Sequence, residues 1–334
     1  MLKKVKYNLR KNETYYICDC KKSNFEKKAL KQIRTEGFVV LRNLLTDVHI
    51  DNIVKPVNQI LSRPNIGGNL GYYRKDIFKK MYDALLLGRP VIDLFLNKKM
   101  LNFLKKYFQT DFYLAEANLK YDEGLNHVYF PMHSDFDTNW KMPFSSRSLN
   151  LGIEDFKKII GCGIMVYLED TIDGAFCYSP GSHKFHDHNN TSVEKWNEKS
   201  RNKVYQNIVR IEGKKGDIVL FNLLGAHGPE QPVKVHRKVV LGAYYNKDVF
   251  GFEAKTAIPV YLSDLSNLSP EQLKILGVGA KPMSYAEDYH IRHFNRMKCS
   301  KMIFRTFTSL VYLEKLRFKI LNFIRKIKSF NILS

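Results

Sequence analysis

The stretch "GDIVLFNLLGAHGPEQPVKVHRKVVLGAYY", residues 216–245, holds two apolar runs joined by a segment rich in Gly and Pro. Each run has the length of a β-strand, and the Gly and Pro residues between them mark a turn. His227 follows the first run and Arg237 opens the second. The stretch therefore predicts two strands with polar side chains where a strand ends or begins.

The same pattern of short apolar runs and turn residues continues N-terminal to this stretch. Short apolar runs alternate with turn residues in "DFYLAEANLKY", "HVYFPMHSDF", "GCGIMVYLED" and "GAFCYSPGSH". Many short strands separated by such turns predict an all-β sandwich or barrel at about 110–250. Before it we expect a strand at Phe38–Leu41, a helix capped by Thr46, and largely helical structure over 75–108 with a break at 88–90. The fold class is mainly β with flanking helices (α+β).

The net charge of +21 lies mostly at the two ends of the chain. Residues 1–34 contribute +8 and residues 292–334 contribute +10, so the middle is close to neutral. Basic ends attract polyanions such as a membrane surface, nucleic acid or an acidic partner, or they only aid solubility. The charge therefore says little about the chemistry of the middle, and nucleic acid is an unlikely partner.

The five cysteines indicate reduced thiols. They are scattered and odd in number, without a disulfide framework, which favours a cytoplasmic location. Cys18 and Cys20 lack a second pair at zinc-finger spacing, so we interpret them as a coincidence on the surface. We expect no signal peptide, because the basic start has no apolar segment after it, and no apolar run is long enough for a spanning helix.

The end of the chain predicts a basic amphipathic helix. Leu313, Leu316, Ile320, Phe323 and Ile327 recur at helical spacing, and lysines fall on the other side. Such a helix binds an anionic membrane surface or packs on its own domain, and both readings stay open.

The segment "FPMHSDFD" offers two metal ligands. In a strand, His133 and Asp135 project to the same face, and His227 is the best candidate for a third ligand. Two histidines and one carboxylate on one face of an iron form the facial triad of non-haem Fe(II) oxygenases, which leaves coordination positions open. Arg237, ten residues after His227, is able to grip a dicarboxylate such as 2-oxoglutarate.

A rival ligand set lies in "GSHKFHDHNN", which contains His183, His186 and His188. This segment is polar and turn-like, so we interpret it as an exposed loop near the site entrance.

At this point the chain resembles the phytanoyl-CoA dioxygenase family over roughly 28–250. The similarity rests on "EGFVVLRNLLTD", "HSD", "YLEDTIDGAFCYSPGSHK", and "GDIVLFNLLGAHG" followed by Arg237. The resemblance implies a double-stranded β-helix (jelly-roll) core, Fe(II), O₂, and 2-oxoglutarate oxidised to succinate and CO₂. By the same resemblance, Asn118 and Lys120 in "ANLKY" line the 2-oxoglutarate pocket.

Within the family, "FPMHSDFDTNW" is similar to the stretch around the iron motif of ectoine hydroxylases. Met132 stands where those enzymes have Trp, and an extra residue precedes Trp140, which argues against ectoine itself as substrate. Relatives that halogenate have Gly or Ala at the position of Asp135, so this carboxylate favours hydroxylation, although desaturation or ring closure uses the same triad.

The sequence thus predicts three parts: a basic N-terminal extension (1–27), an oxygenase domain (28–255) and a C-terminal region (256–334) ending in the basic helix. The expected function is an Fe(II)/2-oxoglutarate-dependent hydroxylase acting on a small molecule or a lipid- or glycan-linked substrate. Acyl-CoA is a further option. The alternatives are an oxygenase directed at nucleic acid and a non-catalytic jelly-roll binding protein. We expect a cytoplasmic protein, and contact with a membrane surface through the basic helix is one option.

Overall fold

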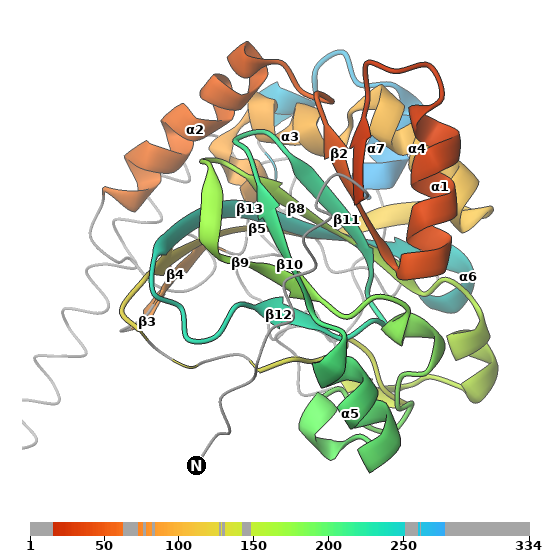
Figure 1. The fold of residues 1–334 in the computed structure, drawn as a ribbon. Coiled ribbons are helices and arrows are strands. Elements are labelled where there is room, and N and C mark those ends of the chain that lie inside the picture. The colour runs from red at the N-terminus through yellow and green to blue at the C-terminus, as the bar shows by residue number, and fades with distance from the viewer. Residues whose placement is uncertain are drawn as a thin grey trace, which may run out of the picture.

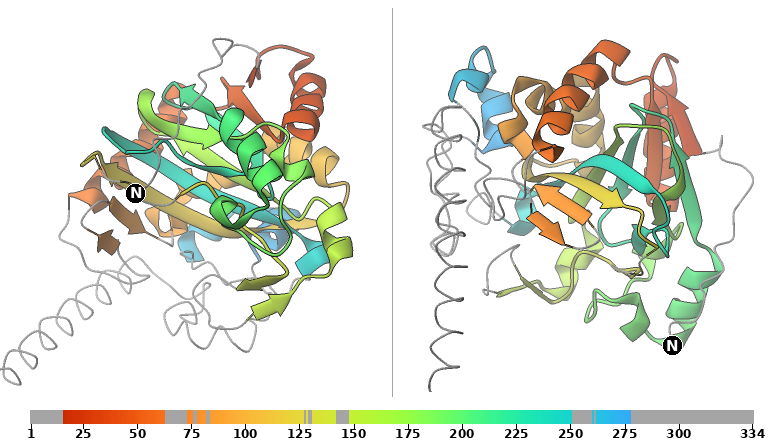
Figure 2. Two further views of the ribbon diagram at one scale, coloured as in Figure 1. Left: turned by 60° about the horizontal axis from the view of Figure 1, so that its bottom comes forward. Right: turned by 90° about the vertical axis from the view of Figure 1, so that its left-hand side faces the viewer.

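The fold consists of two facing β-sheets with helices over the outer side of the larger sheet (Figure 1). Figure 2 shows these layers from two further directions. A computed structural model describes residues 16–62, 73–75, 78–81, 84–126, 128, 131–141, 148–250, 260 and 262–277.

The larger sheet has eight strands. Only β1 and β2 pair in parallel; the other neighbours are antiparallel. In spatial order the strands are β1 (Ile17–Asp19), β2 (Phe38–Arg42), β11 (Ile218–Asn222), β8 (Gly161–Tyr167), β13 (His236–Asn246), β5 (Phe112–Glu123), β4 (Phe78–Met81) and β3 (Tyr73–Lys75).

The smaller sheet faces the middle of the larger one. Its strands, in spatial order, are β10 (Val209–Gly213), β9 (Thr171–Tyr178) and β12 (His227–Pro229). A separate hairpin joins β6 (Asn139–Lys141) to β7 (Ser148–Asn150). Two antiparallel sheets packed face to face, with strands that alternate between them, form the jelly-roll core that the sequence predicted.

Helices cover the outer face of the large sheet because one side of each is apolar. In α2 (Asp47–Leu61) the side chain of Thr46 accepts the first-turn N–H of His49, as a helix N-cap does. The same face is covered by α1 (Phe25–Glu36), α3 (Arg89–Phe95), α4 (Lys98–Phe108) and α7 (Pro270–Leu276). Two helices lie elsewhere, α5 (Glu198–Gln206) beside the smaller sheet and α6 (Lys247–Phe250) at the end of β13 (Figure 1). Short 3₁₀ turns occupy Ala84–Leu87, Ile153–Lys157, Ser182–Lys184, Val193–Lys195 and Leu262–Leu265.

The helical interpretation of 75–108 holds for its second half only. The helices α3 and α4 lie there, and Gly88 (φ 103°) provides the break between turns. Phe78–Met81 is instead the strand β4, which pairs with β5 at the edge of the large sheet. This short segment has no periodicity of its own, so pairing with a neighbouring strand decides its conformation.

A register shift in β5 changes which side chains face the interior of the jelly roll. On β13, Ala243 pairs with Glu116 while Tyr244 pairs with Leu114, so Ala115 is an extra residue. Before the shift, Tyr113 and Ala115 belong to the cluster between the sheets. After it, Ala117 and Leu119 pack toward the helices, so the even-numbered residues from Glu116 onward face inward.

Two hydrophobic clusters stabilise these layers. One fills the space between the large sheet and the helices, and it includes Ile33, Ile53, Phe95, Phe103 and Leu220. The other fills the jelly roll between the two sheets and is rich in aromatic rings.

Cys18 and Cys20 are buried, so the interpretation of a surface coincidence is wrong. Both lie at β1, which pairs with β2 and covers their side chains, and all four described cysteines are free thiols. The described part of the predicted extension 1–27 thus contributes a strand to the large sheet. The basic tail at 292–334 lies outside the described residues, and no described helix is long and apolar enough to cross a membrane.

Candidate metal centre

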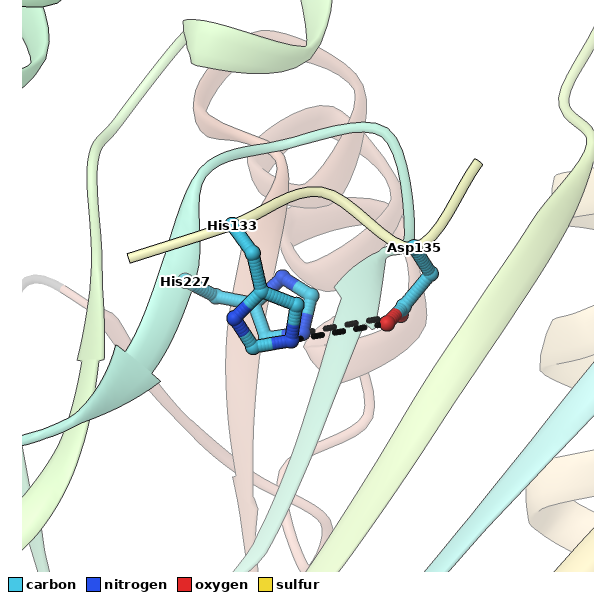
Figure 3. A group of neighbouring side chains, drawn as sticks. All are labelled: His133, Asp135 and His227. Carbon is cyan, nitrogen blue, oxygen red and sulfur yellow. Dashed lines mark ion pairs between the residues drawn. The ribbon is translucent and has the colours of Figure 1, made fainter. Parts of the chain in front are cut away.

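Three side chains from two distant segments meet inside the jelly roll. His133, Asp135 and His227 each offer a ligand atom, and these atoms lie within 4.8 Å of one another. The Nε2 atoms of His133 and His227 lie 3.6 Å and 3.5 Å from the two carboxylate oxygens of Asp135. Figure 3 shows the two imidazoles side by side, both turned toward the carboxylate.

The segment that carries His133 and Asp135 is not the regular strand that the sequence predicted. Only His133 forms a bridge, and it exchanges two backbone hydrogen bonds with His227, at 2.9 and 2.8 Å. The N–H of Ser134 bonds to Thr191 and that of Asp135 to Leu223. The three N–H groups thus bond to two distant segments, and these bonds hold the extended chain across the site without continuous strand pairing.

Local hydrogen bonds set the orientation of both imidazoles. The Nδ1 atom of His133 lies 2.9 Å from the carbonyl of Pro131, and the Nδ1 atom of His227 lies 2.9 Å from that of Gly225. A carbonyl only accepts, so Nδ1 carries the proton and Nε2 presents its lone pair to the centre. This is the tautomer that binds a metal.

Burial shifts the pKa of all three groups. It lowers the pKa of His133 to about 4, with a further contribution from His227, and it lowers the pKa of His227 to about 4. Burial raises the pKa of Asp135 to about 6. At neutral pH the site therefore presents two neutral imidazoles and one carboxylate, and a bound divalent cation would lower the carboxyl pKa again.

Arg237 is a buried side chain at the beginning of β13. Its Nε and Nη2 atoms donate to Oδ2 of Asp122, at 3.1 and 2.6 Å, and both residues are buried. Lys120 lies 3.3 Å from the other oxygen of Asp122, and burial lowers its pKa to about 8. The Nη1 atom of Arg237 is buried without a hydrogen-bond partner. A buried, unpaired guanidinium nitrogen fits the distal carboxylate of a dicarboxylic acid.

The other predicted pocket residue, Asn118, is buried on the same face of β5. Its amide lies 3.3 Å from the carboxylate of Glu116, which also accepts a hydrogen bond from Tyr245 at 3.0 Å. Sequence reasoning missed Asp122 and Glu116. The alternation of polar residues in "EANLKYD" was a signal for both, because every second residue of a strand shares a face.

The rival histidines do not form a metal site, and the interpretation as an exposed loop is wrong. His186 is buried and His183 and His188 are half-buried. Nδ1 of His188 lies 2.9 Å from Nε2 of His186, and the ring of Phe156 packs on both imidazoles. Among the described residues, His133, Asp135 and His227 are the only cluster with metal-ligand geometry.

Comparison with known proteins assigns a family to this chain. Residues 33–231 match the family model of the phytanoyl-CoA dioxygenases. The three clustered residues fall inside the match, whereas Arg237 lies just beyond it. No curated protein is significantly similar to the chain in sequence.

Solved structures share the fold at low sequence identity. EctD from S. alaskensis with bound Fe has a TM-score of 0.53 and 16% identity, covering 66% of this chain and 76% of its own. The epimerase SnoN from nogalamycin biosynthesis has a TM-score of 0.50 and 12% identity, with 66% and 82% covered. AviO1 from Streptomyces viridochromogenes Tue57 has a TM-score of 0.50 and 16% identity, with 67% and 96% covered. The predictions of the family and of the jelly-roll fold are confirmed.

Proposed function

The chain belongs to the phytanoyl-CoA dioxygenase family of Fe(II)- and 2-oxoglutarate-dependent oxygenases, and we propose that His133, Asp135 and His227 hold its iron. The observation that carries this assignment is the convergence of the three ligand atoms within 4.8 Å. Two nitrogens and one oxygen suit Fe(II), and three residues leave coordination positions for the cosubstrate and O₂.

The protein supplies two neutral imidazoles, one carboxylate and their orientation. The Nδ1 hydrogen bonds keep both imidazoles in the metal-binding tautomer. Bound iron together with 2-oxoglutarate and O₂ supplies the oxidising chemistry, with release of succinate and CO₂. Around His227, the rings of Phe176 and Phe221 lie 5.6 and 4.8 Å from the imidazole and exclude water from this side.

Arg237 anchors the far end of 2-oxoglutarate in this proposal. Its buried Nη1 atom is available, while Asp122 holds the guanidinium in place through the other two nitrogens. Lys120 supplies a second positive charge at the same place. Asn118 stays a proposed pocket residue on the strength of its burial on the inner face of β5.

We propose hydroxylation of a small molecule as the reaction, because Asp135 occupies the position that halogenating relatives leave to chloride. Desaturation or ring closure remains an alternative outcome of the same site. The basic tail, as a contact to a membrane surface, and the cytoplasmic location stay proposals, since the tail lies outside the described residues. An oxygenase directed at nucleic acid is the alternative; weak binding to DNA and RNA at physiological salt would exclude it.

An anaerobic titration tests the assignment. Fe(II) and 2-oxoglutarate added to wild-type protein should produce the weak visible charge-transfer band of the chelate, and His227→Ala should abolish it. His236→Ala is the matched control, because this exposed histidine lies on β13 outside the cluster. A band that survives in His227→Ala would refute the ligand set. No band in folded wild-type protein would favour the non-catalytic binding protein.

A further inference from the structure

Glu116 is a carboxylate of the inner face that neither the iron site nor the cosubstrate pocket uses. The register shift at Ala115 turns it into the jelly roll, on the same face as Asn118. The Tyr245 hydroxyl donates to Glu116, and the Tyr245 ring lies 5.4 Å from that of Phe136, the residue after Asp135. Glu116 therefore faces the same interior as the iron ligands.

The hydrogen bonds of Glu116 come from neutral groups. The Tyr245 hydroxyl lies 3.0 Å from Oε1 and the Asn118 amide lies 3.3 Å from Oε2. Within the described ranges, no Lys, Arg or His lies within 4.0 Å of either oxygen. Asp122 differs, because Lys120 and Arg237 both contact it.

Two lysines on neighbouring strands reach the iron ligands electrostatically: Lys80 on β4 acts on Asp135, and Lys120 on β5 acts on His133. Neither forms an ion pair with Glu116, whose described hydrogen bonds come from Tyr245 and Asn118. A half-buried carboxylate held by neutral donors alone is able to pair with a cationic group of a ligand.

We propose that Glu116 binds a positively charged group of the substrate, an ammonium or a guanidinium. This inference rests on the proposed function, since it places the substrate beside the iron ligands. Aromatic rings adjoin Tyr245, with Phe136, Trp140 and Phe250 at 5.4, 5.9 and 4.9 Å between ring centroids. These buried rings pack on one another and fix the Tyr245 hydroxyl, and with it Glu116, in place. The substrate class is thus a small organic cation, and an acyl-CoA or another anionic substrate is disfavoured.

Three probes of equal size test this proposal. Butylammonium, butanol and butyrate are offered to the protein loaded with Zn(II), a redox-silent substitute for iron, and 2-oxoglutarate. Saturation-transfer NMR measures the binding of each probe. Wild-type protein should bind butylammonium at least about tenfold more tightly than butanol, and butyrate most weakly, because a charge-assisted hydrogen bond forms only with the cation. Equal binding of the three probes, or a preference for butyrate, overturns the proposal without any variant.

Two substitutions localise the preference. Glu116→Gln keeps the shape but removes the charge, so the preference for butylammonium should disappear; its amide oxygen accepts from Asn118 while its N–H donates to the Tyr245 oxygen. Glu116→Lys should reverse the preference toward butyrate. Glu123→Gln is the matched control on the same strand, because Glu123 points away from the interior and pairs with Lys79. A preference that persists in Glu116→Gln overturns the assignment to this residue.

The binding of 2-oxoglutarate in the same samples separates two failures. Wild-type protein that binds no 2-oxoglutarate refutes the proposed function itself. Protein that binds 2-oxoglutarate but shows no preference for the cation refutes only the role of Glu116.

Discussion

Replacing Arg237 by Met separates its structural role from its proposed role in cosubstrate binding. The substitution removes the guanidinium and leaves Asp122, which is 0% exposed, with Lys120 as its only described cationic partner. Breaking a buried ion pair from one side costs about 3–5 kcal/mol, and we expect the lower end, about 3 kcal/mol, because Lys120 remains. Urea unfolding followed by circular dichroism measures this loss.

The same variant should bind 2-oxoglutarate about 10- to 100-fold more weakly, since hydrogen bonds to charged groups contribute about 1.5–3 kcal/mol. Isothermal titration of the Zn(II)-loaded protein measures the dissociation constant. Arg42→Met is the matched control, because Arg42 makes a comparable two-nitrogen contact with Asp217 far along the sheet. It should lower stability by about 1.5 kcal/mol and leave 2-oxoglutarate binding unchanged.

The double variant Asp122→Asn/Arg237→Met completes the test. It removes both members of the pair, so its loss of stability should be smaller than the sum of the single losses by about 2 kcal/mol. Binding of 2-oxoglutarate should stay as weak as in Arg237→Met. If Arg237→Met unfolds more easily yet binds 2-oxoglutarate within twofold of wild type, Arg237 is purely structural and our reasoning about the cosubstrate fails.

Three further outcomes follow from the site and the core. Because the pKa of Asp135 is raised to about 6, protons compete with the metal below that pH, and Co(II) should bind about tenfold more weakly at pH 5 than at pH 7; equal affinity would contradict this. Gly225→Ala should lower both stability and metal affinity, because its Cβ would lie 1.7 Å from the Tyr178 hydroxyl. Gly152→Ala, whose Cβ would meet Asp155 Oδ2 at an ordinary contact distance of 3.6 Å, is the control, and similar effects of the two would argue against the steric reason. The four described cysteines should resist a thiol reagent in native protein and react after unfolding, since all are buried; rapid reaction of two or more thiols would contradict their burial.

The cluster of His133, Asp135 and His227, which we propose as the iron ligands, was predictable from short sequence motifs. His133, Asp135, His227 and Arg237 stand at spacings that few other arrangements explain, and the strand pattern around them predicted the jelly roll. The prediction of a regular strand at His133 was not correct, because the N–H groups of this segment find partners in two separate segments, at Thr191 and at Leu223 to His227. Partners so far apart in sequence leave no local pattern.

The other features that the sequence did not predict also depend on tertiary contacts. The burial of His186 depends on Phe156, thirty residues earlier. The inward direction of Glu116 depends on one extra residue, Ala115, which reverses the alternation within β5. Hydrophobic periodicity depends only on the sequence of one strand. It therefore predicts neither a packing partner from another loop nor a shift in the pairing between strands.

The paired backbone hydrogen bonds between His133 and His227 also bear on how the protein acquires its metal. They make the spacing of the two imidazoles a property of the sheet, so loading with an ion requires no folding step. Exchange of one ion for another then requires changes only at Asp135 and at the coordination positions that the protein leaves open. A scaffold of this kind discriminates weakly among divalent ions, which bind N and O ligands in the Irving–Williams order whatever the enzyme requires. Under the proposed assignment we therefore expect the metal supply to decide occupancy by iron, and a purified sample to carry a record of the medium in which it was made.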